Sequence, residues 1–213
     1  MAGYRSSILD HPDSVKGNVN NRLPQVQVGV LVAFLGVLST GCAGDEGDAV
    51  EQEAPLGQET TATSSSGVNT LTAAEESEGW QLLFDGDDLD QWRGYQRETP
   101  PASWQPQDSV LAFADAEDGG DLVTREQYGD FEFHYDWRIS EGGNSGVIYR
   151  VAETSDAPWH TGPEMQILDD ERHPDAKAGV NGNRTAGALY DMIAPPQGVV
   201  RPAGQWNEAR IVA

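Results

Sequence analysis

The sequence predicts an all-β fold, an antiparallel β-sandwich or jelly roll, over residues 79–213. Runs of Val, Ile, Phe, Tyr and Trp recur about every ten residues, separated by Gly, Asp, Asn and Pro, as in short strands joined by turns. Residues 131–139 place an aromatic or apolar side chain at every second position, the pattern of a strand with one buried face. No long helical period interrupts these runs. Together these observations favour a sandwich of short strands.

Individual segments support this prediction. Residues 142–146 are rich in Gly, and we expect a turn rather than a phosphate-binding loop, because the lysine and helix of such loops are absent. Residues 169–188 are charged and glycine-rich, and long irregular loops often border a functional site. Residues 210–213 have strand character with no turn after them, so we expect the last strands of the sandwich to be missing. The strands are expected at residues 80–84, 131–139, 147–150 and 163–169.

The chain is strongly acidic, and its charge is unevenly distributed. Its 213 residues carry a formal net charge of -22. Residues 1–42 hold three basic and two acidic side chains, residues 43–78 nine acidic and none basic, and residues 79–213 ten basic and twenty-four acidic. Such an acidic surface repels nucleic-acid phosphates and anionic lipid headgroups. We therefore expect no nucleic-acid partner, whereas a neutral sugar is compatible with this charge.

A lipoprotein signal peptide is predicted over residues 1–42. Residues 26–38 are almost wholly apolar, follow Arg22 and lead through three small residues to Cys42, the layout of an export signal. The apolar run is short for a transmembrane helix. Small residues before a cysteine resemble the lipobox of bacterial lipoproteins, in which the acylated cysteine becomes the new N-terminus. The alternatives are an ordinary signal peptide with an incidental cysteine and an uncleaved anchor.

These features predict an exported protein that acylated Cys42 holds to membrane lipid, at the outer membrane, in the periplasm or at the cell surface. Residues 43–78 consist mainly of Gly, Ser, Thr, Ala and acids, so they bury too little apolar surface to offset the entropy of ordering. We expect them to form a disordered acidic tether between the anchor and the sandwich. Cys42 is the single cysteine, which excludes an intramolecular disulfide.

Polar side chains alternate with apolar ones on three of the predicted strands, and we expect them to line one concave surface. Carboxylates, a histidine, arginines and an amide on one surface could transfer protons and bind sugar hydroxyls. The candidate catalytic residues are Glu164, Asp136, Arg150 and His134. The candidate substrate-binding residues are Gln166, Asn144, Tyr190, Trp159 and Asp169.

Plainer explanations exist for the same residues. Alternation on a single strand often only places polar groups on a solvated face, and a lone histidine such as His134 is more often a surface residue than a catalyst. His160 and His173 could bind a metal with neighbouring aspartates, but their spacing matches no strong metal motif. The sequence therefore requires no cofactor, although a divalent metal ion is compatible with it.

The segment from about residue 79 to residue 213 carries a series of short motifs, each modest alone but specific in their order together. They are Leu83-Phe84-Asp85-Gly86, Tyr128-Gly129-Asp130-Phe131-Glu132, Asn144-Ser145-Gly146-Val147 with Arg150, residues 162–169, Arg172-His173-Pro174-Asp175, residues 187–191 and Gly204-Gln205-Trp206-Asn207-Glu208. With these motifs in this order, the segment resembles the 3-keto-disaccharide hydrolase family, long known only as a domain of unknown function. Family members usually continue with a tryptophan-containing segment, an Asn-Gly turn and a closing strand, which this sequence does not include.

The resemblance implies a concanavalin-like jelly roll and cleavage of oxidised sugars, the 3-keto-glycosides. A ketone at C3 acidifies the C2 proton, so a base can form an enediolate that expels the C1 substituent, and water then adds. We expect Glu164 or Asp136 as the base, and Arg150, His134, Gln166 or a divalent ion to polarise the ketone oxygen. The competing interpretations are a noncatalytic carbohydrate-binding, laminin-G-like module and a structural surface protein.

Overall fold

The computed structural model describes residues 3–10, 69–114 and 117–213. It holds one short α-helix, two 3-10 turns and ten strands within these ranges. In chain order they are β1 (Gly3–Asp10), α1 (Ala73–Glu78), β2 (Trp80–Leu82), β3 (Trp92–Gly94), β4 (Trp104–Gln107), β5 (Val110–Phe113), β6 (Leu122–Thr124), β7 (Phe131–Arg138), β8 (Asn144–Ile148), η1 (Pro158–His160), β9 (Glu164–Leu168), η2 (Pro174–Lys177) and β10 (Asn207–Val212).

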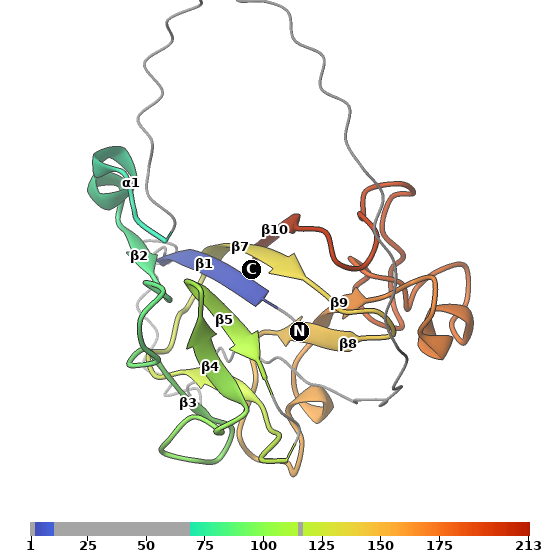
Figure 1. Ribbon diagram of the computed structural model, residues 1–213, viewed down its shortest axis with the longest axis horizontal. Coiled ribbons are helices and arrows are strands. Elements are labelled where there is room, and N and C mark those ends of the chain that lie inside the picture. Colours follow the sequence, from blue (N-terminus) through green and yellow to red (C-terminus); the bar gives the residue numbers. More distant parts are fainter. Residues whose placement is uncertain (1–2, 11–68, 115–116) are drawn as a thin grey trace, which may run out of the picture.

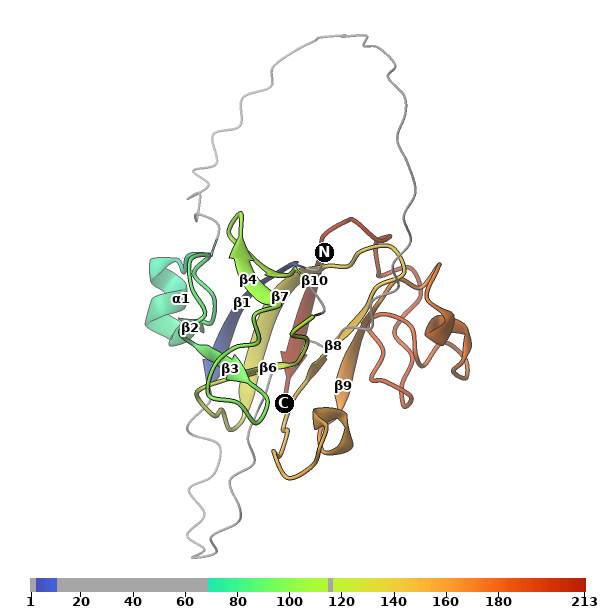
Figure 2. The same ribbon diagram turned by 60° about the horizontal axis from the view of Figure 1, so that its bottom comes forward.

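The strands form one large sheet and two small ones, and the strand pairs are antiparallel. The large sheet has the order β10-β7-β1-β5-β4, and β2 also pairs with β1. β8 pairs with β9, and β3 pairs with β6. Figures 1 and 2 show the β8–β9 pair lying beside the large sheet as a separate layer. The predicted all-β, antiparallel fold class is confirmed.

The backbone of β1 occupies the middle of the large sheet. It pairs with β7 along its whole length, from Gly3 opposite Arg138 to Asp10 opposite Phe131, and with β5 and β2 on its other side. Residues 3–10 fall within the predicted signal peptide, where no strand was predicted. Strands far apart in the chain are thus neighbours in space, as Figure 1 shows for blue β1 and yellow β7. Cys42 and the predicted lipobox lie outside the described residues.

A short helix lies inside the segment predicted as a disordered tether. Thr72 caps α1: its hydroxyl accepts from the Glu75 amide, and the Glu75 carboxylate accepts from the Thr72 amide at 2.7 Å. This reciprocal capping box stabilises a first turn that composition alone does not predict, and Gly79 ends the helix with a φ of 94°. The last residues of the segment expected to be a tether, 73–78, are therefore helical, and residues 43–68 lie outside the described residues. No helix within the described residues is both long and apolar enough to cross a membrane.

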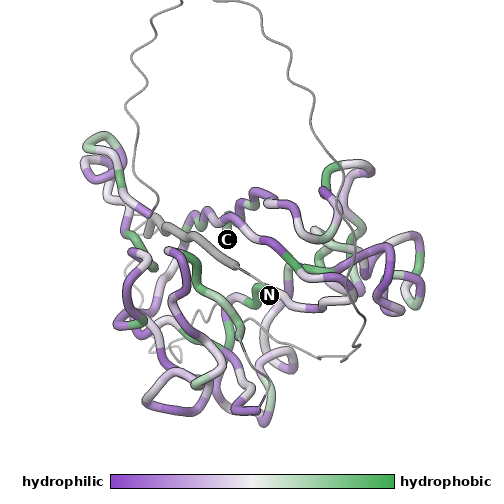
Figure 3. Tube along the Cα trace, viewed as in Figure 1, coloured by the Kyte–Doolittle hydropathy of each residue, from purple (hydrophilic) through white to green (hydrophobic). Residues whose placement is uncertain are grey.

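The hydrophobic core lies between the large sheet and the β8–β9 pair. The aromatic row of β7, predicted from the alternation, is at most 3 % exposed: Phe131, Phe133, Tyr135 and Trp137. Val147 of β8 and Ile167 of β9 belong to the same buried cluster, and the Tyr135 hydroxyl donates to Met165 Sδ at 3.0 Å across the layers. Figure 3 shows apolar stretches inside the fold and polar ones along the outer loops. Burying these side chains supplies the main driving force for joining the two layers.

Candidate functional site

A half-open hollow of about 440 Å³ lies over the β8–β9 pair. This volume is within the range of small-molecule sites. The lining combines polar groups with an apolar margin: Asn144, Ser145, Trp159, Gly162, Pro163, Glu164, Gln166, Tyr190 and Met192. Five of the nine residues predicted to form the site therefore meet here, namely Glu164, Gln166, Asn144, Tyr190 and Trp159.

Strand alternation aims Glu164 and Gln166 into this hollow. Met165 and Ile167 face the large sheet and the core, so the residues at the alternate positions of β9 point the other way. Gln166 is buried and its Oε1 accepts from the Ile167 amide at 3.0 Å. This bond leaves the two Nε2 hydrogens as donors. The strand thus supplies a carboxylate and an amide donor from alternate residues, whose Cα atoms are about 7 Å apart in an extended strand.

Gly146 makes room for the Glu164 side chain. Gly146 lies on β8 opposite Gln166, and a Cβ atom added to it would lie 1.9 Å from Glu164 Oε1 and 2.7 Å from Glu164 Cδ. The carboxylate therefore rests against the glycine backbone of the neighbouring strand. Glycine at residue 146 leaves the space that the Glu164 side chain occupies. The requirement for glycine is therefore one of packing and not of backbone conformation.

The Glu164 carboxylate is electrostatically destabilised. Burial raises its pKa to about 7, with further contributions from the negative charges of Asp175 and Asp121. Among the described residues, no hydrogen bond or ion pair is formed by this carboxylate. A carboxylate with a near-neutral pKa and free lone pairs in a cavity is suited to accept a proton at physiological pH.

Hydrogen bonds and ion pairs hold Tyr190, which lines the hollow, in place. The Tyr190 hydroxyl donates to Asp175 Oδ2 at 2.8 Å, and Arg184 Nη1 lies 3.1 Å from Asp175 Oδ1. Arg184 also contacts both carboxylate oxygens of Asp191, at 2.9 and 3.0 Å, and its guanidinium lies 5.3 Å from the centre of the Tyr190 ring. Burial and the bond to Asp175 raise the pKa of Tyr190 to about 12. The Tyr190 side chain is therefore held in place in the lining of the hollow, and its hydroxyl group is a poor acid.

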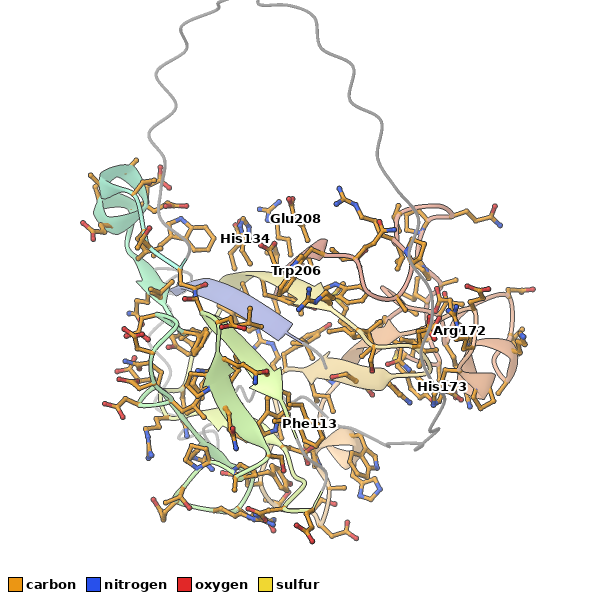
Figure 4. All side chains as sticks on the ribbon, in the orientation of Figure 1. Phe113, His134, Arg172, His173, Trp206 and Glu208 are labelled. Atoms are coloured by element: carbon orange, nitrogen blue, oxygen red, sulfur yellow. The ribbon has the colours of Figure 1, made fainter. Side chains whose placement is uncertain are left out.

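Asp136 and His134 do not belong to the hollow. They alternate with the aromatic row of β7 and so lie on the face of the large sheet turned away from β9. His134 Nε2 lies 2.7 Å from Glu132 Oε1, and Arg210 binds the same carboxylate. Figure 4 shows His134 with Trp206 and Glu208 over β7 and β10, far from the loop that carries Arg172 and His173. The prediction that three strands present one shared concave face is therefore wrong, because β7 and β9 belong to opposite layers.

Arg150 and Asp169 are also placed elsewhere. Arg150 has a φ of 54°, which breaks the alternation after β8, and its exposed guanidinium lies 3.2 Å from Asp130. The Asp169 carboxylate is buried and accepts from the amides of Gly142 at 2.7 Å and Glu171 at 3.1 Å. Burial opposes the charge of Asp169, but these amides outweigh it and lower the pKa. Asp169 closes a turn at the end of β9 and does not line the hollow.

No metal centre is evident in the part of the chain that the structure describes. No group of three or more His, Cys, Asp or Glu side chains there is close enough to hold an ion. His173 Nδ1 accepts from the Asp175 amide, and His160 Nδ1 contacts Ser155 and Asp156. The two histidines thus serve local turns.

Sequence reasoning missed Ser145 and Met192 in the lining, and Asp175 and Arg184 behind it. Ser145 carries no signal apart from its place in the Asn144-Ser145-Gly146 motif. Asp175 belongs to the Arg172-His173-Pro174-Asp175 motif, which marked the segment without indicating its contact with Tyr190. Arg184 lies in a glycine-rich loop, and the fold alone brings it to Asp175.

The chain is similar to known proteins in sequence and in fold. A 3-keto-disaccharide hydrolase of Bacteroides thetaiotaomicron is 34% identical over 202 residues, which cover 86% of this chain and 68% of the relative. The 1.70 Å crystal structure of a candidate glycosyl hydrolase from Parabacteroides distasonis superposes with a TM-score of 0.60 and 35% identity, covering 68% of each chain.

The fold, the hollow and these relatives define the class: an all-β hydrolase that cleaves glycosides. Residues 79–213 match the 3-keto-alpha-glucoside-1,2-lyase-like domain. The chain belongs to this family, and the resemblance found in its motifs is confirmed.

Replacing Gly146 tests the packing of Glu164. In G146A we expect the added methyl group to displace the carboxylate, since the clash is with the end of a flexible side chain and not with the backbone. The protein should therefore fold with a nearly unchanged Tm and lose at least tenfold in kcat/KM, which is more than about 1.4 kcal/mol of transition-state stabilisation. In an E164Q background the same substitution should add little; equal losses in both backgrounds would show that Gly146 acts independently of Glu164.

Proposed function

We propose that this glycoside-cleaving enzyme acts on 3-keto-glycosides, including 3-keto-disaccharides, by removing the C2 proton with Glu164. The observation that carries the proposal is the unpaired Glu164 carboxylate, whose pKa is raised to about 7 at the centre of a sugar-sized hollow. The name of the Bacteroides relative and the 1,2-lyase description of the family support this substrate class. An elimination across C1 and C2 requires the loss of the C2 proton.

The proposed reaction is an elimination across C1 and C2 followed by the addition of water. Glu164 accepts the C2 proton, and the electron pair of that C–H bond forms an enediolate with the C3 ketone. Collapse of the enediolate restores the ketone, forms the C1–C2 double bond and breaks the bond from C1 to the leaving oxygen, which takes up the proton that Glu164 removed from C2. Water then adds across the double bond. One base near the ring is sufficient for this route, whereas ordinary glycosidases need two carboxylates flanking the scissile bond.

Amide donors would stabilise the charge that develops on the ketone oxygen. Gln166 Nε2 is directed by the bond between its Oε1 and the Ile167 amide, and Asn144 lines the same end of the hollow. Hydrogen-bond donors fixed before the reaction stabilise an enediolate without further reorganisation. Arg150, His134 and Asp136 do not line the hollow, so we assign polarisation of the ketone oxygen to Gln166 and Asn144.

Substituting Glu164 separates catalysis from binding. In E164Q we expect kcat on 3-ketotrehalose to fall by at least 10³-fold, the scale of a lost general base, with sugar binding retained. The matched control is E208Q, the same change on the exposed face of β10, which should keep normal turnover. Product release by chromatography and binding by calorimetry give the two readouts. Near-normal turnover by E164Q would remove Glu164 from the mechanism.

The raised pKa of Glu164 predicts the pH dependence. Below about pH 7 the carboxyl group is protonated and cannot accept the C2 proton, so kcat/KM should rise about tenfold per pH unit from pH 5 to 6 and level off above a midpoint near 7. The profile should be measured on a 3-keto-glucoside, at pH values where the folded state persists. A flat profile between pH 5 and 8 would contradict the role of Glu164 as the base.

The second candidate function is a noncatalytic sugar-binding module. The exposed aromatic side chain of Trp159 at the hollow favours it, because such rings stack on sugars in proteins that only bind. Binding of a 3-keto-glucoside by the wild-type protein without product release would support the module. A primary isotope effect with substrate deuterated at C2 would support catalysis by proton abstraction.

We also propose that the protein is exported and anchored to membrane lipid through Cys42. The apolar run at residues 26–38 and the small residues before Cys42 support this proposal. It has a structural consequence, since cleavage before Cys42 would remove β1 from between β7 and β5. The mature sheet would then need another strand at that position or would expose the ladder edge of β7.

The mass of the mature protein tests the anchor. From membranes of an expressing bacterium, we expect a chain that begins at acylated Cys42, and a C42A variant that is found in the soluble fraction. Intact-mass measurement and fractionation give the result. A mature chain that retains residues 3–10 would contradict cleavage and would indicate that β1 is a permanent part of the sheet.

A further inference from the structure

The hollow has two chemically different ends along β9. On one side of Glu164 lie Gln166, Asn144 and Ser145, which offer hydrogen-bonding groups. On the other side, Pro163 leads back to Trp159, and Met192 lines the same hollow. Trp159 is 55% exposed and Met192 is 68% exposed. Along the chain, Glu164 thus lies between this polar end of β9 and the segment of Trp159 that precedes the strand. Trp159 and Met192 are the exposed apolar side chains of the lining, and together they are called the apolar rim.

The segment that carries Trp159 is fixed to the rest of the fold. Arg93 of β3 makes two bonds to Glu153, at 2.7 and 2.6 Å, and both groups are mostly shielded from solvent. The Tyr95 hydroxyl donates to the Ser155 carbonyl oxygen at 2.9 Å, and Pro158 begins the 3-10 turn. Such bidentate and backbone contacts restrict the loop. Trp159 is therefore an exposed aromatic side chain on a restrained loop.

The turn that carries Met192 is fixed as well. Arg184 holds Asp191 through two hydrogen bonds, and the amides of Met192 and Ile193 both donate to the Leu189 carbonyl oxygen at 2.9 Å. Because the backbone of this turn is already restrained, a ligand that covers the side chain does not also have to order the loop, which favours binding. Apolar side chains exposed at the margin of a cavity mark a contact for an apolar ligand surface.

We propose that this apolar rim is the leaving-group subsite and that it favours glycosides with a flat aromatic aglycone. The inference rests on the proposed function: proton removal fixes C2 near Glu164, and the ring hydroxyls require the donors and acceptors at the polar end. The C1 substituent must then extend toward Trp159 and Met192. An aromatic aglycone stacks on an indole face, and a methyl aglycone is too small to cover it.

The test compares two 3-keto-α-glucosides, one with a 4-nitrophenyl and one with a methyl leaving group, in wild-type protein and W159A. Because each substrate is compared with itself, the different reactivity of the leaving groups cancels. We expect W159A to lower kcat/KM for the aryl glycoside about 3–10-fold, the scale of one lost aromatic contact, and for the methyl glycoside less than 2-fold. W159F should recover most of the loss. V180A, which removes part of an exposed apolar side chain outside the hollow, should change neither.

The outcomes separate the two proposals. An equal loss for both substrates in W159A would show that Trp159 contacts the keto ring or shapes the site, and would overturn the leaving-group assignment. If the wild-type protein cleaves neither substrate, the proposed function fails. Calorimetry then tests the apolar rim through binding alone. W159A should weaken binding of the aryl glycoside and leave the affinity for the methyl glycoside unchanged. An unchanged affinity for the aryl glycoside would overturn the leaving-group assignment as well.

Discussion

The packing of β7 against the β8–β9 pair is the contact on which the candidate site depends. Tyr135 and its aromatic neighbours on β7 bury one face of β9 through Met165 and Ile167. Because a strand alternates its side chains with a period of two, this burial forces Glu164 and Gln166 to the opposite face. A shift of β9 by one residue would exchange the two sets, leaving the carboxylate in the core. The hydrophobic core therefore fixes the direction of the Glu164 side chain, the proposed base.

The site uses a carboxylate that the fold destabilises. Most acidic side chains near the hollow have partners: Asp175 binds Tyr190 and Arg184, and Asp191 binds Arg184. Glu164 has none among the described residues and is partly buried against Gly146, so its charged form is disfavoured and its pKa rises. A base with such a pKa is half deprotonated near neutral pH and can both accept and release a proton. The ion pairs of Asp175 and Asp191 with Arg184 hold the surrounding side chains in place, while the Glu164 carboxylate has no ion-pair partner among the described residues.

The chain's strong negative charge fits a neutral substrate. The described residues that line the hollow include no cationic side chain, so they offer an anionic ligand no partner of opposite charge. Amide donors and aromatic faces bind sugars through hydrogen bonds and stacking, which do not depend on net charge. Membership of the 3-keto-alpha-glucoside-1,2-lyase-like family agrees with this chemistry.

The sequence by itself determined the fold class, the family and half of the site. Local patterns carry that information: the alternation of residues 131–139, and the motifs around Asn144, Glu164 and Gln166. Alternation shows that a strand has two faces but not which layer the strand joins, and for that reason Asp136 and His134 were wrongly grouped with Glu164. The helix at residues 73–78 follows from the local capping box of Thr72 and Glu75, which the composition of the segment does not reveal. The tertiary structure alone decided the separation of Asp136 and His134 from Glu164 and the joining of Asp175 and Arg184 to Tyr190. Such contacts depend on sheet order and loop paths, which connect residues distant in the chain.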